Sequence, residues 1–180
     1  MNLSELGIKA RAASVLLAKM NVETKNKALI ACAEALVKES NSILEANAKD
    51  VLIGREKGMN EGLVDRLMLT EERIKGIAEG LEQVAALDDP VGEVLDMKKR
   101  PNGLLIGKKR VPLGVVGMIY EARPNVTPDA FALCFKSGNA VILRGGSDAI
   151  NSNIAIVKVL QDTLKACGIT EDAVQLIEDT

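Results

Sequence analysis

Apolar residues near the start of the chain recur with the spacing of amphipathic helices. Over residues 3–20 they return every three or four positions, which predicts a first helix with one buried face. Thr24 is a candidate N-cap for a longer helix whose apolar side extends to Leu44. We therefore expect two helices within the first 44 residues.

Two further helices are expected before residue 90. The stretch 50–59 predicts a short helix that ends at Gly58. Thr70, followed by two glutamates, predicts the start of another helix, which should stop before Asp88-Asp89-Pro90. Residues 1–90 are therefore predicted to form an N-terminal helical layer.

The pattern changes over residues 91–110. Two runs, 94–99 and 104–109, flank Arg100-Pro101-Asn102-Gly103, and an Asn-Gly turn between such runs favours a β-hairpin. Basic triplets lie in both runs, which leaves a nucleic-acid tract as one interpretation. We favour an exposed charged ribbon that discourages edge pairing, because the chain as a whole is slightly acidic.

Residues 111–180 predict an α/β fold. Val115 to Tyr120 is short, apolar and β-branched, which is typical of a strand covered on both faces. Thr127-Pro128-Asp129 predicts a helix start, 140–143 a second buried strand, 147–166 a helix, and 173–177 a third strand. The β-α-β-α-β order predicts part of a Rossmann-like parallel sheet, preceded by the helical layer and hairpin.

The two predicted strand ends carry residues suited to a ligand. Ligands of open α/β sheets bind beyond the carboxyl ends of the strands, so residues 121–125 and 144–147 should face one crevice. Gly145 and Gly146 permit close backbone approach, and Ser147 opens a helix whose first amides point outward with a partial positive charge. Arg144 adds a cation, and together these residues suit a phosphate. An ordinary loop with a capped helix is the alternative, because neither GxxxxGK[ST] nor GxGxxG is present.

Asn125 is the sharper candidate for chemistry. A side-chain amide at the end of a strand can donate to an oxygen that becomes negative during acyl transfer. The alternative is an Asx-type turn between strand and helix. Arg123 is a candidate for binding an anionic substrate, or it pairs with Glu121 and holds the loop.

Composition limits the classes of function. A formal net charge of −2 gives no case for nucleic-acid or membrane partners. No stretch of the chain has the length of a transmembrane helix and the N-terminus lacks a signal-peptide core, so a cytoplasmic location is the expectation. The chain has no histidine, which excludes histidine-dependent nucleophilic catalysis and histidine metal sites within it, and we expect no metal site.

The three cysteines are predicted to be reduced and structural. They are Cys32, Cys134 and Cys167. Cys134 lies nearest the candidate site, but its apolar neighbours should raise the pKa of a thiol, which argues against a nucleophile.

The stretch VPLGVVGMIYEARPNVTPDAFALCFKSGNAVILRGGSDA resembles the γ-glutamyl phosphate reductase family of the aldehyde dehydrogenase superfamily. The segments LGIKARAAS, ILEANAKDV, LVDRLMLTEERIKGIA and DPVG are similar to the same family. The resemblance implies NADPH-dependent reduction of L-glutamate 5-phosphate to L-glutamate 5-semialdehyde and phosphate, in proline biosynthesis. It also implies that a cysteine thiolate attacks the acyl phosphate and that hydride reduces the resulting thioester.

Site roles and partners follow from the resemblance alone. It implies that Asn125 is an oxyanion-hole donor, that Arg144 binds the adenosine ribose or its phosphate, and that Ser147 has a similar role. It also implies that residues 91–110 are an oligomerisation element of a homo-oligomer, that residues 111–180 begin the NADPH-binding domain, and that glutamate 5-kinase is a candidate partner.

One feature of the resemblance affects the expected activity of this chain. The family's nucleophilic cysteine follows ILRGG at a distance, in a catalytic domain that residues 1–180 do not include, so the chain alone is expected to be inactive. Two alternatives remain: another acyl-reducing member of the superfamily, or a non-catalytic nucleotide-binding module.

Overall fold

The computed structural model describes residues 2–179. Its N-terminal part is helical, as predicted. The helices are α1 (Leu3–Leu17), α2 (Val22–Lys38), α3 (Ser40–Glu56), α4 (Glu61–Leu67) and α5 (Glu71–Ala86). Thr70 caps α5 as expected, since its side chain accepts a hydrogen bond from the amide of Arg73 at 3.1 Å.

Four details of this helical layer differ from the predictions. Asn21, not Thr24, caps α2, because its side-chain oxygen accepts from the Thr24 amide at 2.8 Å. The predicted long helix is broken at Glu39, whose backbone leaves the helical region. This break allows α3 to pack mainly against α7, whereas α2 packs mainly against α5. Helix α3 absorbs the short helix predicted over 50–59, and α4 was not predicted.

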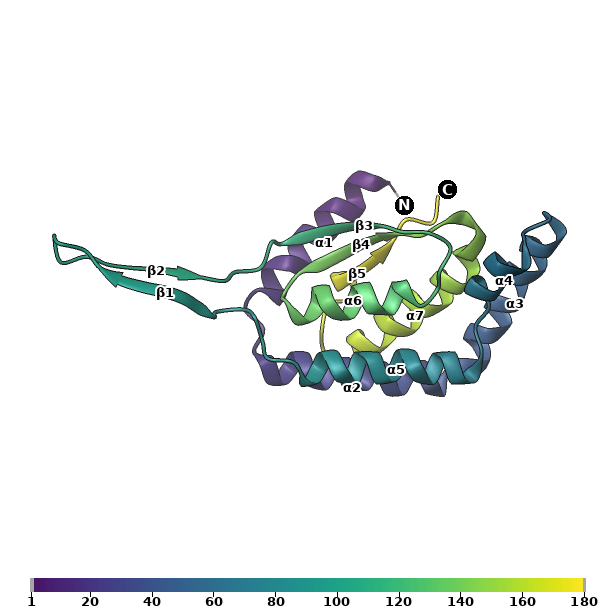
Figure 1. The fold of residues 1–180 in the computed structure, drawn as a ribbon, viewed down its shortest axis with the longest axis horizontal. Helices are drawn as coiled ribbons and strands as arrows, with labels where there is room; N and C mark the ends of the chain where they lie inside the picture. Colours follow the sequence, from purple (N-terminus) through teal and green to yellow (C-terminus); the bar gives the residue numbers. More distant parts are fainter. Residues whose placement is uncertain (1, 180) are drawn as a thin grey trace.

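The hairpin was predicted correctly. Strands β1 (Val94–Lys99) and β2 (Leu105–Lys109) pair antiparallel, with Lys99 opposite Leu105. Gly103 takes the left-handed conformation in the connecting turn, at φ 89°. The ribbon projects from the rest of the molecule, and apart from half-buried Asp96 its strand residues are exposed (Figure 1).

A buried lysine ties the base of this hairpin to the helices. Lys25 on α2 is 1% exposed and forms an ion pair with Asp89, just before the hairpin. Its ammonium also donates to the carbonyl of Lys136, at 3.1 Å. A buried cation needs such partners, because desolvation without them is costly.

The parallel sheet has the predicted β-α-β-α-β order. Strands β3 (Val115–Ile119), β4 (Ala140–Arg144) and β5 (Val174–Leu176) lie in the order β3-β4-β5. Helices α6 (Val126–Lys136) and α7 (Ile150–Ala166) connect them, with short 3₁₀ turns at Ser147–Ala149 and Glu171–Ala173. Both crossovers run the same way along the sheet, so the right-handed rule places both helices on one face.

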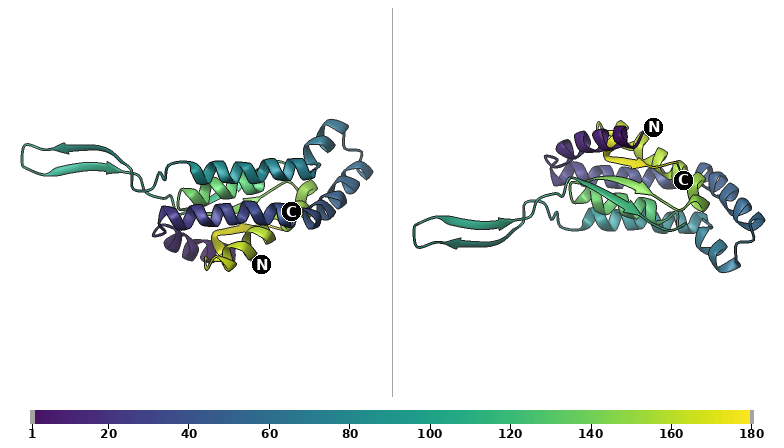
Figure 2. Two further views of the ribbon diagram at one scale, coloured as in Figure 1. Left: turned by 90° about the horizontal axis from the view of Figure 1, so that it is seen from below. Right: turned by 90° about the horizontal axis from the view of Figure 1, so that it is seen from above.

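Figures 1 and 2 show the layers that result. Helices α6 and α7 lie between the sheet and the α2–α5 pair, while α1 packs against β4. The central strand is well covered: Ala140, Val141 and Leu143 are fully buried. Strand β3 is less covered than predicted, because it lies at the edge of the sheet and Ile119 is 78% exposed.

The start of α6 is also displaced from the prediction. The helix begins at Val126, with Asn125 at the N-cap position, so Thr127 lies inside it and does not cap it. The Thr127 hydroxyl is buried and bonds to other side chains, as described below, which is why it is not free to cap. Within residues 2–179, no helix combines the length and apolar character needed to cross a membrane.

Candidate functional site

The loop that follows β3 brings Asn125 and Arg123 to the carboxyl end of the sheet. Two backbone hydrogen bonds shape it: the amide of Arg123 donates to Glu121 at 2.8 Å, and that of Val126 donates to Arg123 at 3.0 Å. Asn125 has helical backbone angles, and its side chain makes no capping hydrogen bond. The Asx-turn alternative is therefore not what the structure contains, and the Asn125 amide is free to meet a ligand.

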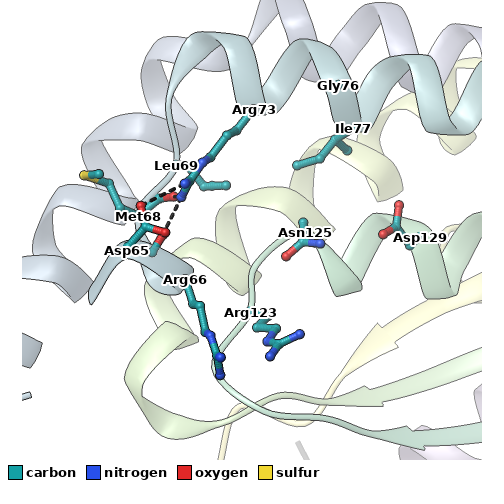
Figure 3. A pocket seen from close by; sticks show the side chains of 10 residues that line it. All are labelled: Asp65, Arg66, Met68, Leu69, Arg73, Gly76, Ile77, Arg123, Asn125 and Asp129. Carbon is teal, nitrogen blue, oxygen red and sulfur yellow. Dashed lines mark hydrogen bonds and ion pairs between the residues drawn. The ribbon is translucent and has the colours of Figure 1, made fainter. Parts of the chain in front are cut away.

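Asn125 and Arg123 line a cavity of about 470 Å³ between the start of α6 and the α4–α5 corner (Figure 3). The other lining residues are Asp65, Arg66, Met68, Leu69, Arg73, Gly76, Ile77 and Asp129. Arg73 is committed within the protein, since it pairs with Asp65 at 2.9 Å and donates to the Met68 carbonyl at 2.7 Å. The cavity therefore combines an unengaged amide with charged side chains from three helices and a loop.

Sequence reasoning did not anticipate the α4–α5 side of this cavity. Arg66, Arg73 and Gly76 carry no local pattern that indicates a site. The one local indication was the presence of Gly76 and Gly80 within a predicted helix. Glycine inside a helix costs roughly 1 kcal/mol of stability relative to alanine, so its presence there suggests a structural or functional requirement.

A buried chain of hydrogen-bonded side chains connects the elements on either side of the Asn125 loop. The Tyr120 hydroxyl lies 2.6 Å from Oγ1 of Thr127, which lies 2.7 Å from Oδ1 of Asn153 on α7. Burial raises the pKa of Tyr120, although its hydrogen bond to Thr127 acts in the opposite direction. Nδ2 of Asn153 has no partner among the described residues. The chain joins the ends of β3, α6 and α7 through side chains alone.

The glycines after β4 are explained by close packing between the two loops. A Cβ on Gly145 would lie 2.3 Å from Nδ2 of Asn153, and one on Gly146 would lie 2.9 Å from the amide of Ala122. A side chain at Gly145 would have to displace the Asn153 amide and the Tyr120 ring, and one at Gly146 would have to displace the backbone of the β3 loop. These glycines therefore hold the two strand-end loops together, and a role in cofactor binding remains a proposal.

The first amides of α7 are not free to bind an anion. Asp50 on α3 accepts hydrogen bonds from the amides of Asn151 and Ser152, at 3.2 and 2.7 Å. It also accepts from the side chains of both residues, at 2.7 and 2.6 Å. The prediction that the helix after Ser147 presents open amides is wrong for α7, because a protein carboxylate already occupies that position.

Arg144 lies at the end of β4 but lines a different cavity. That hollow measures about 730 Å³ and includes Asn2, Leu3, Leu6, Leu176, Ile177, Glu178 and Asp179. Arg144 is exposed there, with no ion-pair partner among the described residues. The expected single crevice is thus two hollows, because the Gly145-Gly146 loop packs against the β3 loop and closes the space between them.

Two further sets of residues from the sequence analysis remain, the Arg123–Glu121 pair and the three cysteines. Arg123 and Glu121 are 3.9 Å apart and largely exposed, so their ion pair is weak. Burial raises the pKa of Cys32 to about 12 and also raises that of Cys134. Neither these thiols nor Cys167 lines the two cavities. Within residues 2–179, no group of three acidic, cysteine or histidine side chains could hold a metal ion.

Comparison with known proteins shows to which fold class this architecture belongs. No protein-family model matches the chain. The structure is similar to an acetylating aldehyde dehydrogenase of Geobacillus thermoglucosidasius, with a TM-score of 0.74 at 15% identity over 98% of this chain and 36% of that one. At that identity the likeness concerns the fold, so the class is the aldehyde dehydrogenase fold.

Within that class, the chain matches the N-terminal portion of gamma-glutamyl phosphate reductases. It is 60% identical to the enzyme of Caldanaerobacter subterraneus over 172 residues, covering 96% of this chain and 42% of that one. The crystal structure of the Thermotoga maritima enzyme superposes with a TM-score of 0.96 at 47% identity, covering 100% of this chain and 44% of that one. The chain therefore spans about two fifths of the length of these relatives.

Proposed function

We propose that this chain belongs to an enzyme that reduces L-glutamate 5-phosphate to L-glutamate 5-semialdehyde and phosphate, in proline biosynthesis. The observation that carries the proposal is Asn125: its side-chain amide ends the YEARPN stretch without an internal partner and opens into a cavity lined with charge. A fixed amide donor in such a place is suited to stabilise an acyl oxygen as it becomes negative.

The nucleophile is proposed to come from sequence beyond residues 1–180. Cys32 and Cys134 are buried with raised pKa values, and a thiolate is needed for attack on an acyl phosphate. In this scheme the present chain positions substrate and polarises its carbonyl, and a thiolate from the catalytic domain attacks it. The chain by itself should therefore oxidise no NADPH.

Residues 111–180 are proposed to begin the domain that binds NADPH. The residues around Arg144 fit NADPH, because the exposed Arg144 guanidinium has no ion-pair partner among the described residues and can pair with the ribose phosphate. Gly145, Gly146 and Ser147 follow Arg144 directly in the chain. NADPH, when bound, supplies the hydride. Because Asp50 caps α7, the phosphate is expected to depend on the Arg144 side chain and not on the helix terminus.

Residues 91–110 are proposed to be an oligomerisation element of a homo-oligomer. The hairpin leaves the body of the protein and exposes apolar side chains on both strands, including Leu95, Met97 and Leu105, at 52%, 53% and 66%. A two-stranded ribbon of this kind is marginal alone and gains stability from a partner surface. A second proposed partner is glutamate 5-kinase, since a kinase must produce the acyl phosphate.

The proposal is tested by Asn125→Ala in the complete protein that carries this chain. A donor to the developing oxyanion acts mainly in the transition state, so kcat should fall on the order of a hundredfold with little change in KM. Thermal unfolding serves as the control and should be unchanged. A variant that melts early but keeps normal kcat per folded molecule would assign Asn125 to the loop only.

A further inference from the structure

Both legs of the hairpin are attached to one turn of the protein, residues 136–139 at the end of α6. A Cβ on Gly138, whose φ is 75°, would lie 2.9 Å from Cγ of Pro112 and 3.4 Å from Cγ2 of Val91. Val91 precedes β1 and Pro112 follows β2, so both legs pack against this one glycine. A side chain at position 138 would push the two legs away from α6.

The first leg is attached through Asp89. Oδ2 of Asp89 pairs with buried Lys25, and its Oδ1 accepts a hydrogen bond from the amide of Val91 at 2.9 Å. Lys25 also donates to the carbonyl of Lys136, at 3.1 Å. Lys136 is itself 3% exposed, and its ammonium donates to the carbonyl of Ala85 on α5 at 2.8 Å. The first leg is therefore part of a buried polar network that includes α2, α5 and α6.

The second leg is attached through Asn139, which is 5% exposed. Its Oδ1 accepts a hydrogen bond from the amide of Gly114 at 2.9 Å, and its Nδ2 donates to the carbonyl of Ser137 at 3.2 Å. The two legs are also joined to each other, because the amide of Gly92 donates to the carbonyl of Arg110 at 2.9 Å. The base of the hairpin is thus held on both legs, whereas its strands project free of the body (Figure 1).

A buried ion pair at this base favours a role in orientation. Removing a lysine ammonium from water is costly, and replacing a buried ion pair by apolar side chains of similar size is often neutral or favourable for stability. Hydrogen bonds between charged groups restrict geometry more than apolar contacts do. Stability alone therefore does not require Lys25 and Asp89, whereas a fixed direction of the hairpin does.

We propose that the residues holding the base of the hairpin aim it at a second copy of the protein. These clamp residues are Lys25, Asp89, Gly138 and Asn139. The inference rests on the proposed function, in which the hairpin joins subunits, and adds what presents the hairpin to its partner. A direction that is fixed before binding reduces the entropy lost on association. A hairpin freed at its base keeps the same apolar surface and should bind more weakly.

The first experiment measures the dissociation constant of the complete protein's assembly by sedimentation. Lys25→Met combined with Asp89→Leu replaces both members of the ion pair, so that no buried charge is left alone. We expect association to weaken by about tenfold or more, with little change in melting temperature. Higher protein concentration should restore the assembly, because the strands are unaltered. Lys27→Met, the same substitution at an exposed position of α2, should change neither quantity.

A second variant tests the other leg without altering any charge. Asn139→Ala removes the acceptor of the Gly114 amide and should also weaken association. Asp50→Ala controls for a general loss of stability, because Asp50 belongs to α3, which lies at the opposite end of the molecule from the hairpin (Figure 1). In the folded fraction of that control, the dissociation constant should equal that of the wild-type protein.

Unchanged association in folded clamp variants would overturn the inference. An equal loss of association in Asp50→Ala would also overturn it, because stability and not direction would then be responsible. The proposed oligomerisation role fails on a different readout, namely an unchanged mass when Leu105 and Ile106 on β2 are both replaced by glutamate. If that pair of substitutions dissociates the assembly while the clamp variants associate normally, the hairpin is the interface but its base does not aim it.

Discussion

Ser152 donates both its backbone amide and its hydroxyl to Oδ2 of Asp50, at 2.7 and 2.6 Å. The two residues lie on different helices, α7 and α3, so the N-terminus of one helix is capped by a carboxylate from another. Because a helix N-terminus is electropositive, the contact is favourable in itself and occupies the position that an anionic ligand would otherwise take.

Loss of this cap should destabilise the fold. Asp50 is 2% exposed and accepts four hydrogen bonds, so Asp50→Ala leaves buried donors without partners. We expect the free energy of unfolding to fall by about 2 to 4 kcal/mol in urea denaturation. Asp162→Ala, which removes only an exposed pair with Lys158, should change it by less than about 0.5 kcal/mol. Equal effects would mean that the cap contributes little.

Arg144 should determine the choice of cofactor. In the complete protein, Arg144→Ala is expected to weaken NADPH binding by roughly 1 to 3 kcal/mol, the range for a lost charge-assisted hydrogen bond. NADH lacks the ribose phosphate and should lose less. Fluorescence titration with both cofactors measures the difference, and Lys158→Ala controls for the change in net charge. A similar loss for the two cofactors would make Arg144 a structural residue.

Asp129 should make the folded protein less stable as the pH rises. Its carboxyl pKa is raised in the folded protein, so the native state holds this proton more tightly than the unfolded chain. Stability therefore falls as the pH rises from the unfolded-state pKa, near 4, through the raised pKa of the folded protein. Below the unfolded-state pKa, Asp129 is protonated in both states and has no such effect on stability.

Asp129→Asn is accordingly expected to raise the melting temperature at pH 7 and to leave it unchanged near pH 3. The rise should be under about 4 °C, because the carboxylate is partly exposed and 1 kcal/mol corresponds to roughly that shift in a domain of this size. Calorimetry at the two pH values checks the sign. A lower melting temperature at pH 7 would indicate that Asp129 stabilises the fold.

The hairpin should control association. Leu105→Glu together with Ile106→Glu places charge on exposed apolar positions of β2, so sedimentation should show a smaller assembly. The melting transition of the dissociated chain should still be cooperative, because these side chains pack against nothing in the body of the protein. Lys108→Glu changes charge without removing apolar surface and should not dissociate the assembly. An unchanged mass in the double variant would exclude the hairpin from the interface.

Local patterns of the sequence were sufficient for the hairpin, the three parallel strands and both ends of α5. The Asn-Gly turn and the apolar runs each act through their immediate neighbours, so their effect is visible in a few consecutive residues. Asn125 could be selected for the same reason, because its place between a strand and a helix follows from adjacent positions.

Tertiary structure decided what depends on residues far apart in the chain. Asp50 meets Ser152 across 102 positions, and Lys25 meets Lys136 across 111, so neither partner could be read from local spacing. Thr127 had the pattern of a cap, yet its hydroxyl bonds to Asn153 because burial demands a partner there. The charged cavity likewise depends on tertiary structure, because α5 packs against α6 and so brings Gly76 to the same cavity as Asp129, while α4 contributes Arg66.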